Sequence, residues 1–153
     1  MRIEKSIVIA RPVEDVWAFL SNLDNVKRWS ISGSEARQTS PGPLSVGTSL
    51  EEVKVVLGRF PLRLRGLVVT EFEPNRTIAL TDNRPGIAQP GRQRFTVEPI
   101  EVGTRLTVVV EINLKRGILP FEGMLTKLSS WGVPRQLANM KRLVETGVSS
   151  EPS

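Results

Sequence analysis

The alternation of apolar and polar residues predicts a chain made mostly of β-strands. Stretches with this pattern, or rich in β-branched residues, are residues 2–10, 47–58, 60–74, 76–82, 92–100 and 103–115. In the last of them Leu106, Val108 and Val110 alternate with Arg105 and Thr107. This alternation is typical of an antiparallel strand with one face on the core.

Residues 11–29 change to the spacing of an amphipathic helix. We expect two short helices here, the first with Trp17 and Leu20 on its apolar side. Asp24 is a candidate N-cap for the second, which ends near Trp29.

The last periodic segment, residues 121–146, predicts a long helix but contains Gly132 and Pro134. Proline inside a helix costs roughly 3 kcal/mol. One interpretation is a continuous helix that covers a cavity and bends here, because the missing hydrogen bond then faces space that a ligand or water can fill. The other is a loop over 129–134, with the helix starting near Pro134. Either interpretation puts a break beside Trp131.

Composition narrows the choice of function. The 153 residues predict one domain over residues 1–146 with a flexible tail over 147–153. There is no apolar run near 18 residues and no secretory signal, so we expect no integral membrane association and a cytoplasmic location.

Three residue types that often carry catalysis are missing. The chain has no His, Cys or Tyr, so it lacks the usual general base, thiolate and phenol. We therefore predict no catalytic residue, no cofactor and no metal site. The net charge of +5 comes with no run of four basic residues, so a nucleic-acid partner is not expected either.

Three segments resemble one superfamily: "SIVIARPVEDVWAFLSNLDNVKRW" (6–29), "VVTEFEPNRTIAL" (68–80) and "LANMKRLVE" (137–145). They are similar to the SRPBCC superfamily, which includes START lipid-transfer domains and the major birch pollen allergen, and most of all to its polyketide cyclase/dehydrase and lipid-transport branch. The resemblance covers about residues 2–146. It implies an α+β helix-grip fold: a curved antiparallel sheet of six to seven strands wraps a long C-terminal helix, and two short helices follow strand 1.

The resemblance also implies a deep apolar cavity between sheet and helix. Strand and helix periodicity then selects the residues expected to line it and bind a ligand. These are Trp29, Phe72, Gln93, Phe95, Val97, Leu106, Val108, Val110, Leu125, Leu128, Trp131 and Met140. By the same resemblance the loop 83–93 borders the cavity mouth. Arg84 and Arg92 would there contact a ligand carboxylate or phosphate, unless both are simply solvated.

The inward face of strand 47–58 stays open at this stage. Glu52 and Lys54 share a face with Leu50, whereas Glu51 and Val53 share the other. Solvent exposure of Glu52 and Lys54 is the simpler interpretation, because a buried pair needs close partners.

These observations favour a non-catalytic protein that binds or carries a hydrophobic small molecule: a lipid, an acyl chain, a quinone or a polyketide-like ring. The alternative is a polyketide cyclase/dehydrase-like enzyme that uses Glu52, Glu111 or a loop arginine. A third possibility is an interaction module with a solid core and an exposed apolar patch. A monomer and a homodimer are both compatible with the sequence.

Overall fold

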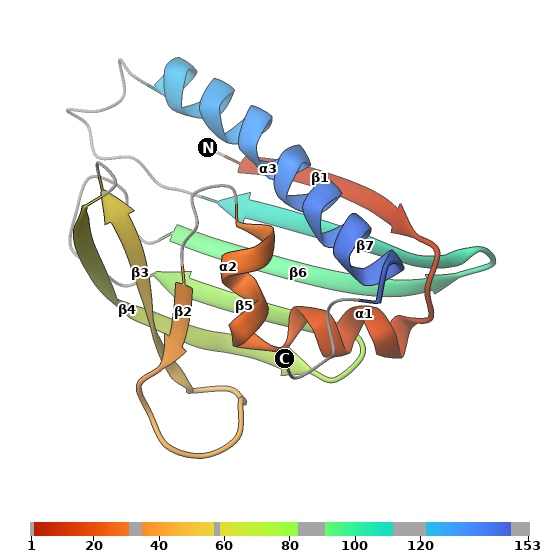
Figure 1. The fold of residues 1–153 in the computed structure, drawn as a ribbon, viewed down its shortest axis with the longest axis horizontal. Helices are drawn as coiled ribbons and strands as arrows, with labels where there is room; N and C mark the ends of the chain where they lie inside the picture. Colours follow the sequence, from red (N-terminus) through yellow and green to blue (C-terminus); the bar gives the residue numbers. More distant parts are fainter. Residues whose placement is uncertain (1, 31–34, 57–58, 83–90, 112–121, 148–153) are drawn as a thin grey trace.

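The computed structural model describes residues 2–30, 35–56, 59–82, 91–111 and 122–147, with side chains except at 54–56, 60–65, 82 and 122–131. The elements follow the predicted order of strand, short helices, strands and long helix (Figure 1). They are β1 (Arg2–Ile9), α1 (Val13–Leu20), η1 (Leu23–Asn25), α2 (Val26–Trp29), β2 (Glu35–Gln38), β3 (Ser49–Val56), β4 (Phe60–Glu73), β5 (Thr77–Asp82), β6 (Gly91–Ile100), β7 (Gly103–Glu111) and α3 (Glu122–Glu145).

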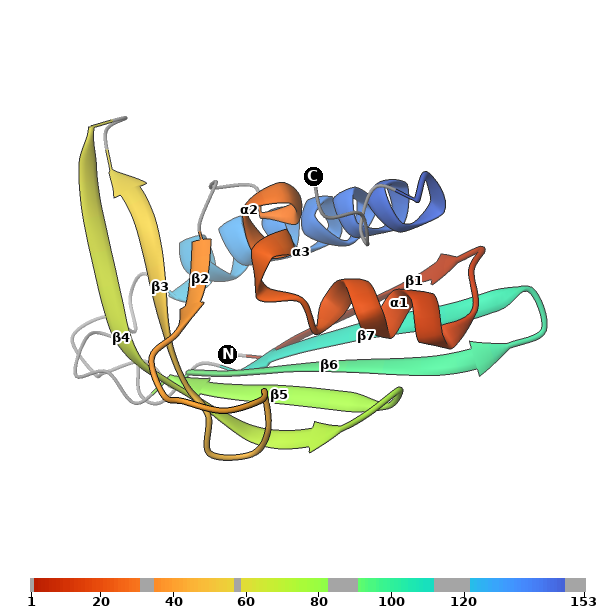
Figure 2. The ribbon, with the colours of Figure 1, turned by 60° about the horizontal axis from the view of Figure 1, so that its bottom comes forward.

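The seven strands form one antiparallel sheet in the order β1-β7-β6-β5-β4-β3-β2. Figure 2 shows α1, α2 and α3 over one face of this sheet, with β3 and β4 curving up beside them. The sheet therefore wraps around α3, and the predicted helix-grip fold is confirmed. No helix within the described ranges is long and apolar enough to cross a membrane.

We call the face of the sheet under the helices the inner face. Strand register aligns its apolar residues in rows; Ile78, Phe95 and Val108, for example, are neighbours on β5, β6 and β7. The helices bury their own apolar sides against it, with Phe19 of α1 and Met140 of α3 each 1% exposed. Each such side chain contributes roughly 1.5–3 kcal/mol of burial free energy, and this burial holds the helices on the sheet.

α3 is one continuous helix across Pro134, so the interpretation of residues 129–134 as a loop is wrong. Val133, Leu137 and Met140 are buried on its inner side, whereas Pro134 is exposed. The carbonyl that Pro134 leaves without an N–H partner lies one turn earlier on the same side of the helix. The expectation that the missing bond faces a cavity stays a prediction, because the surroundings of residue 130 lie outside the described side chains.

Two local predictions also need correction. The side chain of Asn22 caps η1 by accepting from the backbone N–H of Asp24 at 3.0 Å, so Asp24 is not the cap. Asn25 occupies the N-cap position of α2, but its buried amide donates to Phe19 O at 3.1 Å. β2 was not predicted, because its four residues "EARQ" carry no apolar alternation.

Candidate functional site

The candidate site is the inner face where β5, β6 and β7 lie under α2 and α3. Every second residue of β6 lies beside a residue of β7 on this face. Gln93 pairs with Val110, Phe95 with Val108 and Val97 with Leu106. Four of the predicted strand residues are buried and three are half-buried. The buried ones are Phe95, Val97, Leu106 and Val108, and the half-buried ones are Phe72, Gln93 and Val110.

Two tryptophans come down from the helices onto this face. Trp29 of α2 meets the ring of Phe95 edge-on, with ring centres 6.2 Å apart, and Trp17 of α1 meets Phe72 in the same way at 5.6 Å. Each tryptophan is 8% exposed. Such edge-to-face pairs contribute about 0.5–1.5 kcal/mol beyond burial, so they fix both rings in place.

The position of Trp29 is set from both sides. Its side chain rests on Phe95, and its backbone carbonyl accepts a hydrogen bond from Asn139 Nδ2 of α3 at 3.2 Å. Its indole nitrogen Nε1, however, is buried and has no hydrogen-bond partner among the described residues. Met140, one residue after Asn139, contributes apolar surface from α3 to the same core.

Four predicted site residues lie outside the part that the structure describes. Arg84 is one of them, and the other three are Leu125, Leu128 and Trp131, whose side chains on the first turns of α3 are not described. The wall that these residues were expected to form stays a prediction.

Arg92 lies on the other face of the sheet. Its guanidinium is 2.6 Å from Glu71, which also pairs with Arg94 at 3.1 Å. Side chains alternate along a strand, so Arg92 points away from the face that holds Gln93 and Phe95. We therefore leave Arg92 out of the candidate site. Counting by twos from Phe95 would have given this result from the sequence.

The carboxylates of Glu51, Glu52 and Glu111 differ in the face of the sheet on which they lie and in their exposure. Glu52 follows Leu50 by two residues, so it shares the inner face, and it is half-buried. Glu51 faces the opposite way between Arg37 and Arg65 in the register, yet it is only 7% exposed. Glu111 is exposed, and its carboxylate lies 3.8 Å from Arg2. Nothing in the sequence pattern indicated that Glu51 would be the buried carboxylate.

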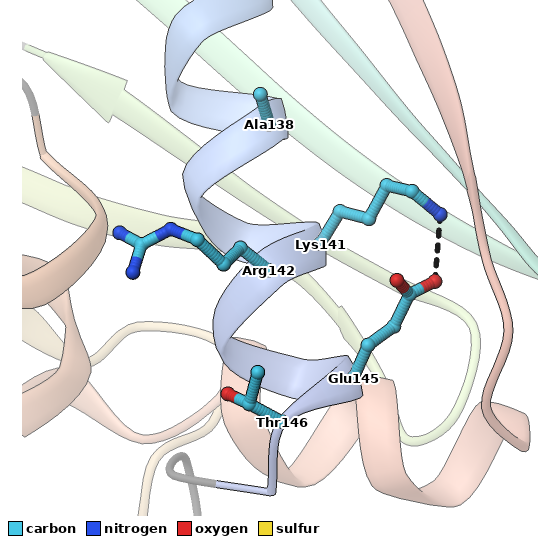
Figure 3. A pocket seen from close by; sticks show the side chains of 5 residues that line it. All are labelled: Ala138, Lys141, Arg142, Glu145 and Thr146. Carbon is cyan, nitrogen blue, oxygen red and sulfur yellow. Dashed lines mark hydrogen bonds and ion pairs between the residues drawn. The ribbon is translucent and has the colours of Figure 1, made fainter.

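Two surface hollows lie away from this site. One, of about 350 Å³, adjoins the C-terminal turns of α3 and is lined by Ala138, Lys141, Arg142, Glu145 and Thr146 (Figure 3). The other, of about 240 Å³, lies on the outer face of the sheet, and its lining includes Arg92 and Arg94. Within the described ranges, no group of three or more acidic residues is placed to hold a metal ion.

In the first hollow, Glu145 holds the end of α3 against the connection between β1 and α1. Its carboxylate accepts from the backbone N–H of Ala10 at 2.8 Å and from Lys141 Nζ at 2.6 Å. These two hydrogen bonds, with the nearby charges of Lys141 and Arg11, hold the pKa of Glu145 below its usual value. The contact is therefore structural and lies outside the inner face.

Solved structures share this fold at low sequence identity. The protein TTHA0849 from Thermus thermophilus matches with a TM-score of 0.77 and 16% identity, covering 97% of this chain and 100% of its own. The Zhui aromatase/cyclase from Streptomyces sp. R1128 gives a TM-score of 0.77 and 13% identity over 97% and 95% of the two chains. A START superfamily protein from Mycobacterium smegmatis gives 0.75 and 17% over 95% and 97%.

Comparisons of the amino-acid sequence, in contrast to those of the fold, give two results. No curated protein matches the chain significantly. The profile of the family described as polyketide cyclase / dehydrase and lipid transport matches residues 1–145, nearly the whole chain. With the helix-grip fold and the apolar inner face in view, the chain belongs to the polyketide cyclase / dehydrase and lipid transport family.

Proposed function

We propose that this chain, as one domain over residues 1–146, binds or carries a hydrophobic small molecule between the inner face and the helices, without catalysis. The observation that carries the proposal is the apolar inner face, on which Trp29 and Trp17 each meet a strand phenylalanine. Apolar ligand surface buried there would supply roughly 25 cal/mol per Å² of affinity. A lipid, an acyl chain, a quinone or a polyketide-like ring all fit this chemistry.

Binding is favoured over catalysis by the residues that the chain lacks. Without His, Cys or Tyr, acid–base chemistry would depend on carboxylates, lysine, arginine or hydroxyls. Among the described residues, Gln93 places a polar group on the inner face near Phe95. Its amide can orient a ligand but does not exchange protons at ordinary pH.

The first experiment is native mass spectrometry of freshly purified protein, followed by denaturation and identification of any released molecule. A discrete apolar mass at near-stoichiometric occupancy would support the carrier proposal and name its ligand class. If the protein is free of ligand and also binds no apolar fluorescent probe, the proposal fails, and an interaction module with a solid core becomes the better explanation.

A pair of neighbouring valines on β7 tests the location of binding. Val110 lies on the inner face beside Gln93, whereas Val109 points outward next to Arg94. We expect Val110→Phe to fill inner space and weaken binding of the uncharged probe N-phenyl-1-naphthylamine about tenfold or more. Val109→Phe, the matched control, should bind as the wild type does. Equal affinities of both folded variants, in a fluorescence titration, would place the probe elsewhere.

Glu52 is the observation that favours the second candidate, a cyclase/dehydrase-like enzyme. Its half-buried carboxylate on the inner face could accept a proton from a bound substrate. The test is incubation of the identified ligand with the protein and mass analysis of the products. Conversion that Glu52→Gln abolishes while ligand affinity is kept would favour the enzyme; an unchanged ligand would favour the carrier.

A further inference from the structure

The indole N–H of Trp29 is an unsatisfied donor inside the candidate site. Trp29 is 8% exposed, and its Nε1 is the one buried side-chain N or O atom of the described residues without a hydrogen-bond partner. Leaving such a group unpaired is costly, because the N–H loses its hydrogen bond to water on folding and gains none in return. Buried polar atoms are usually paired, so an exception asks for an explanation.

The described neighbours of Trp29 do not supply that partner. The ring of Phe95 lies against the indole, and the hydrogen bond from Asn139 Nδ2 goes to the backbone carbonyl of Trp29, not to its indole. The packing that fixes the ring therefore also fixes the N–H in an apolar setting. A rigid donor of this kind orients a ligand at little cost in side-chain entropy.

Gln93 provides a second polar group on the same face. It lies two residues before Phe95 on β6, about 7 Å along the strand, and it is half-buried. Trp29 and Gln93 thus border Phe95 from the helix layer and from the strand. A ligand lying on Phe95 could reach either group.

We infer that the molecule bound on this face carries a neutral oxygen acceptor, such as a ketone, quinone or ester carbonyl, which accepts a hydrogen bond from Trp29 Nε1. This inference rests on the proposed function and narrows its ligand class. A pure hydrocarbon would leave the N–H unpaired. A carboxylate would bring a full charge against Phe95 with only this neutral donor for compensation, which is costly in an apolar site.

The test compares two probes with the same carbon skeleton, 2-methyl-1,4-naphthoquinone and 2-methylnaphthalene. Only the quinone has carbonyl acceptors, and the chain has no cysteine with which a quinone would react. Both affinities are measured by titration of ¹⁵N-labelled protein, in which the three tryptophans give three indole signals. Trp29→Phe assigns the signal of Trp29.

The decisive variant is Trp29→3-benzothienylalanine, in which sulfur replaces the N–H and the shape of the ring is kept. The same replacement at Trp17, which is equally buried, is the control. We expect the ratio of quinone to hydrocarbon affinity to fall about two- to tenfold at Trp29 and to stay unchanged at Trp17.

The two possible failures are distinguishable. If both probes bind and shift the Trp29 signal, but the ratio is the same in wild type and variant, the inference is overturned while the proposed function stands. If neither probe binds, the proposed function fails and the inference fails with it.

Discussion

Gly103 opens β7 at a point where the turn from β6 passes close to the end of β1. Its φ is +142°, in a region that side-chain-bearing residues rarely adopt. A Cβ at this position would overlap the carbonyl oxygen of Ile9 and press on the backbone of Ala10. Both the conformation and the close approach therefore require glycine.

We expect Gly103→Ala to lower the free energy of unfolding by roughly 2 kcal/mol or more, because backbone strain and a clash with backbone add. Gly42→Ala is the control, since Gly42 has a φ of +94° but open space around it. It should cost only the strain, about 1–2 kcal/mol. Urea unfolding of both variants makes the comparison, and equal losses would show that the approach to Ile9 is not a constraint.

At the candidate site, the strand residues were the predictable part. The period of two selects Phe95, Val97 and Val108 from the sequence alone, because one face of an antiparallel strand is buried. The resemblance implies a place at the cavity mouth for Arg92, whereas the period of two puts it on the outer face, where it pairs with Glu71. The unpaired N–H of Trp29 could not be predicted, since it depends on how α2 and α3 pack together.

At the scale of elements, long periodic segments were predictable and short ones were not. β2 forms because it can pair with β3, and its register places Arg37 opposite Glu51. Nothing within its own four residues signals a strand. The continuity of α3 also depends on contacts outside the segment. Tertiary packing of Leu137 and Met140 outweighs the local cost of Pro134, and the sequence of the helix alone does not show this packing.

We expect Pro134→Ala to raise the free energy of unfolding by about 2 kcal/mol. An interior proline costs roughly 3 kcal/mol relative to alanine, and its loss makes the unfolded chain more flexible, which offsets about 1 kcal/mol. Pro134 is exposed, so no core contact is lost. Pro43→Ala, in the connection between β2 and β3, is the control and should be neutral or slightly destabilising in urea. A destabilised Pro134→Ala would mean that the proline ring itself supports the helix.

At the scale of the whole molecule, α3 must stay fixed over the sheet for any ligand site to persist beneath it. Its C-terminal end is joined to the opposite end of the chain through polar contacts. Lys141 Nζ donates to the carbonyl of Val8 at 2.8 Å, and Arg11 donates to the carbonyl of Glu145 at 2.9 Å. With the Glu145 carboxylate on Ala10, these contacts attach the helix to the edge of the sheet.

Acid should weaken the attachment of α3 to the sheet edge, and the variant Glu145→Gln measures the contribution of the Glu145 charge. Because the pKa of Glu145 is lowered in the folded protein, its stabilisation is present above the usual value of 4.5 and is lost as the pH falls through the folded-state value. Glu145→Gln should therefore melt below the wild type at neutral pH, and the gap should close as the pH falls below 4.5 and through the lowered pKa of Glu145.

Thermal unfolding followed by circular dichroism from about pH 3 to pH 7 measures this gap, and Glu101→Gln serves as the control. Glu101 is an exposed residue in the turn between β6 and β7, so its replacement should leave the melting temperature unchanged at every pH. Lys141 and Arg11 are the charged groups that face Glu145. A gap that is the same at both ends of the range would show that Glu145 acts by shape alone. A gap that closes in acid would show that its charge holds α3 to the sheet edge and keeps the inner face covered.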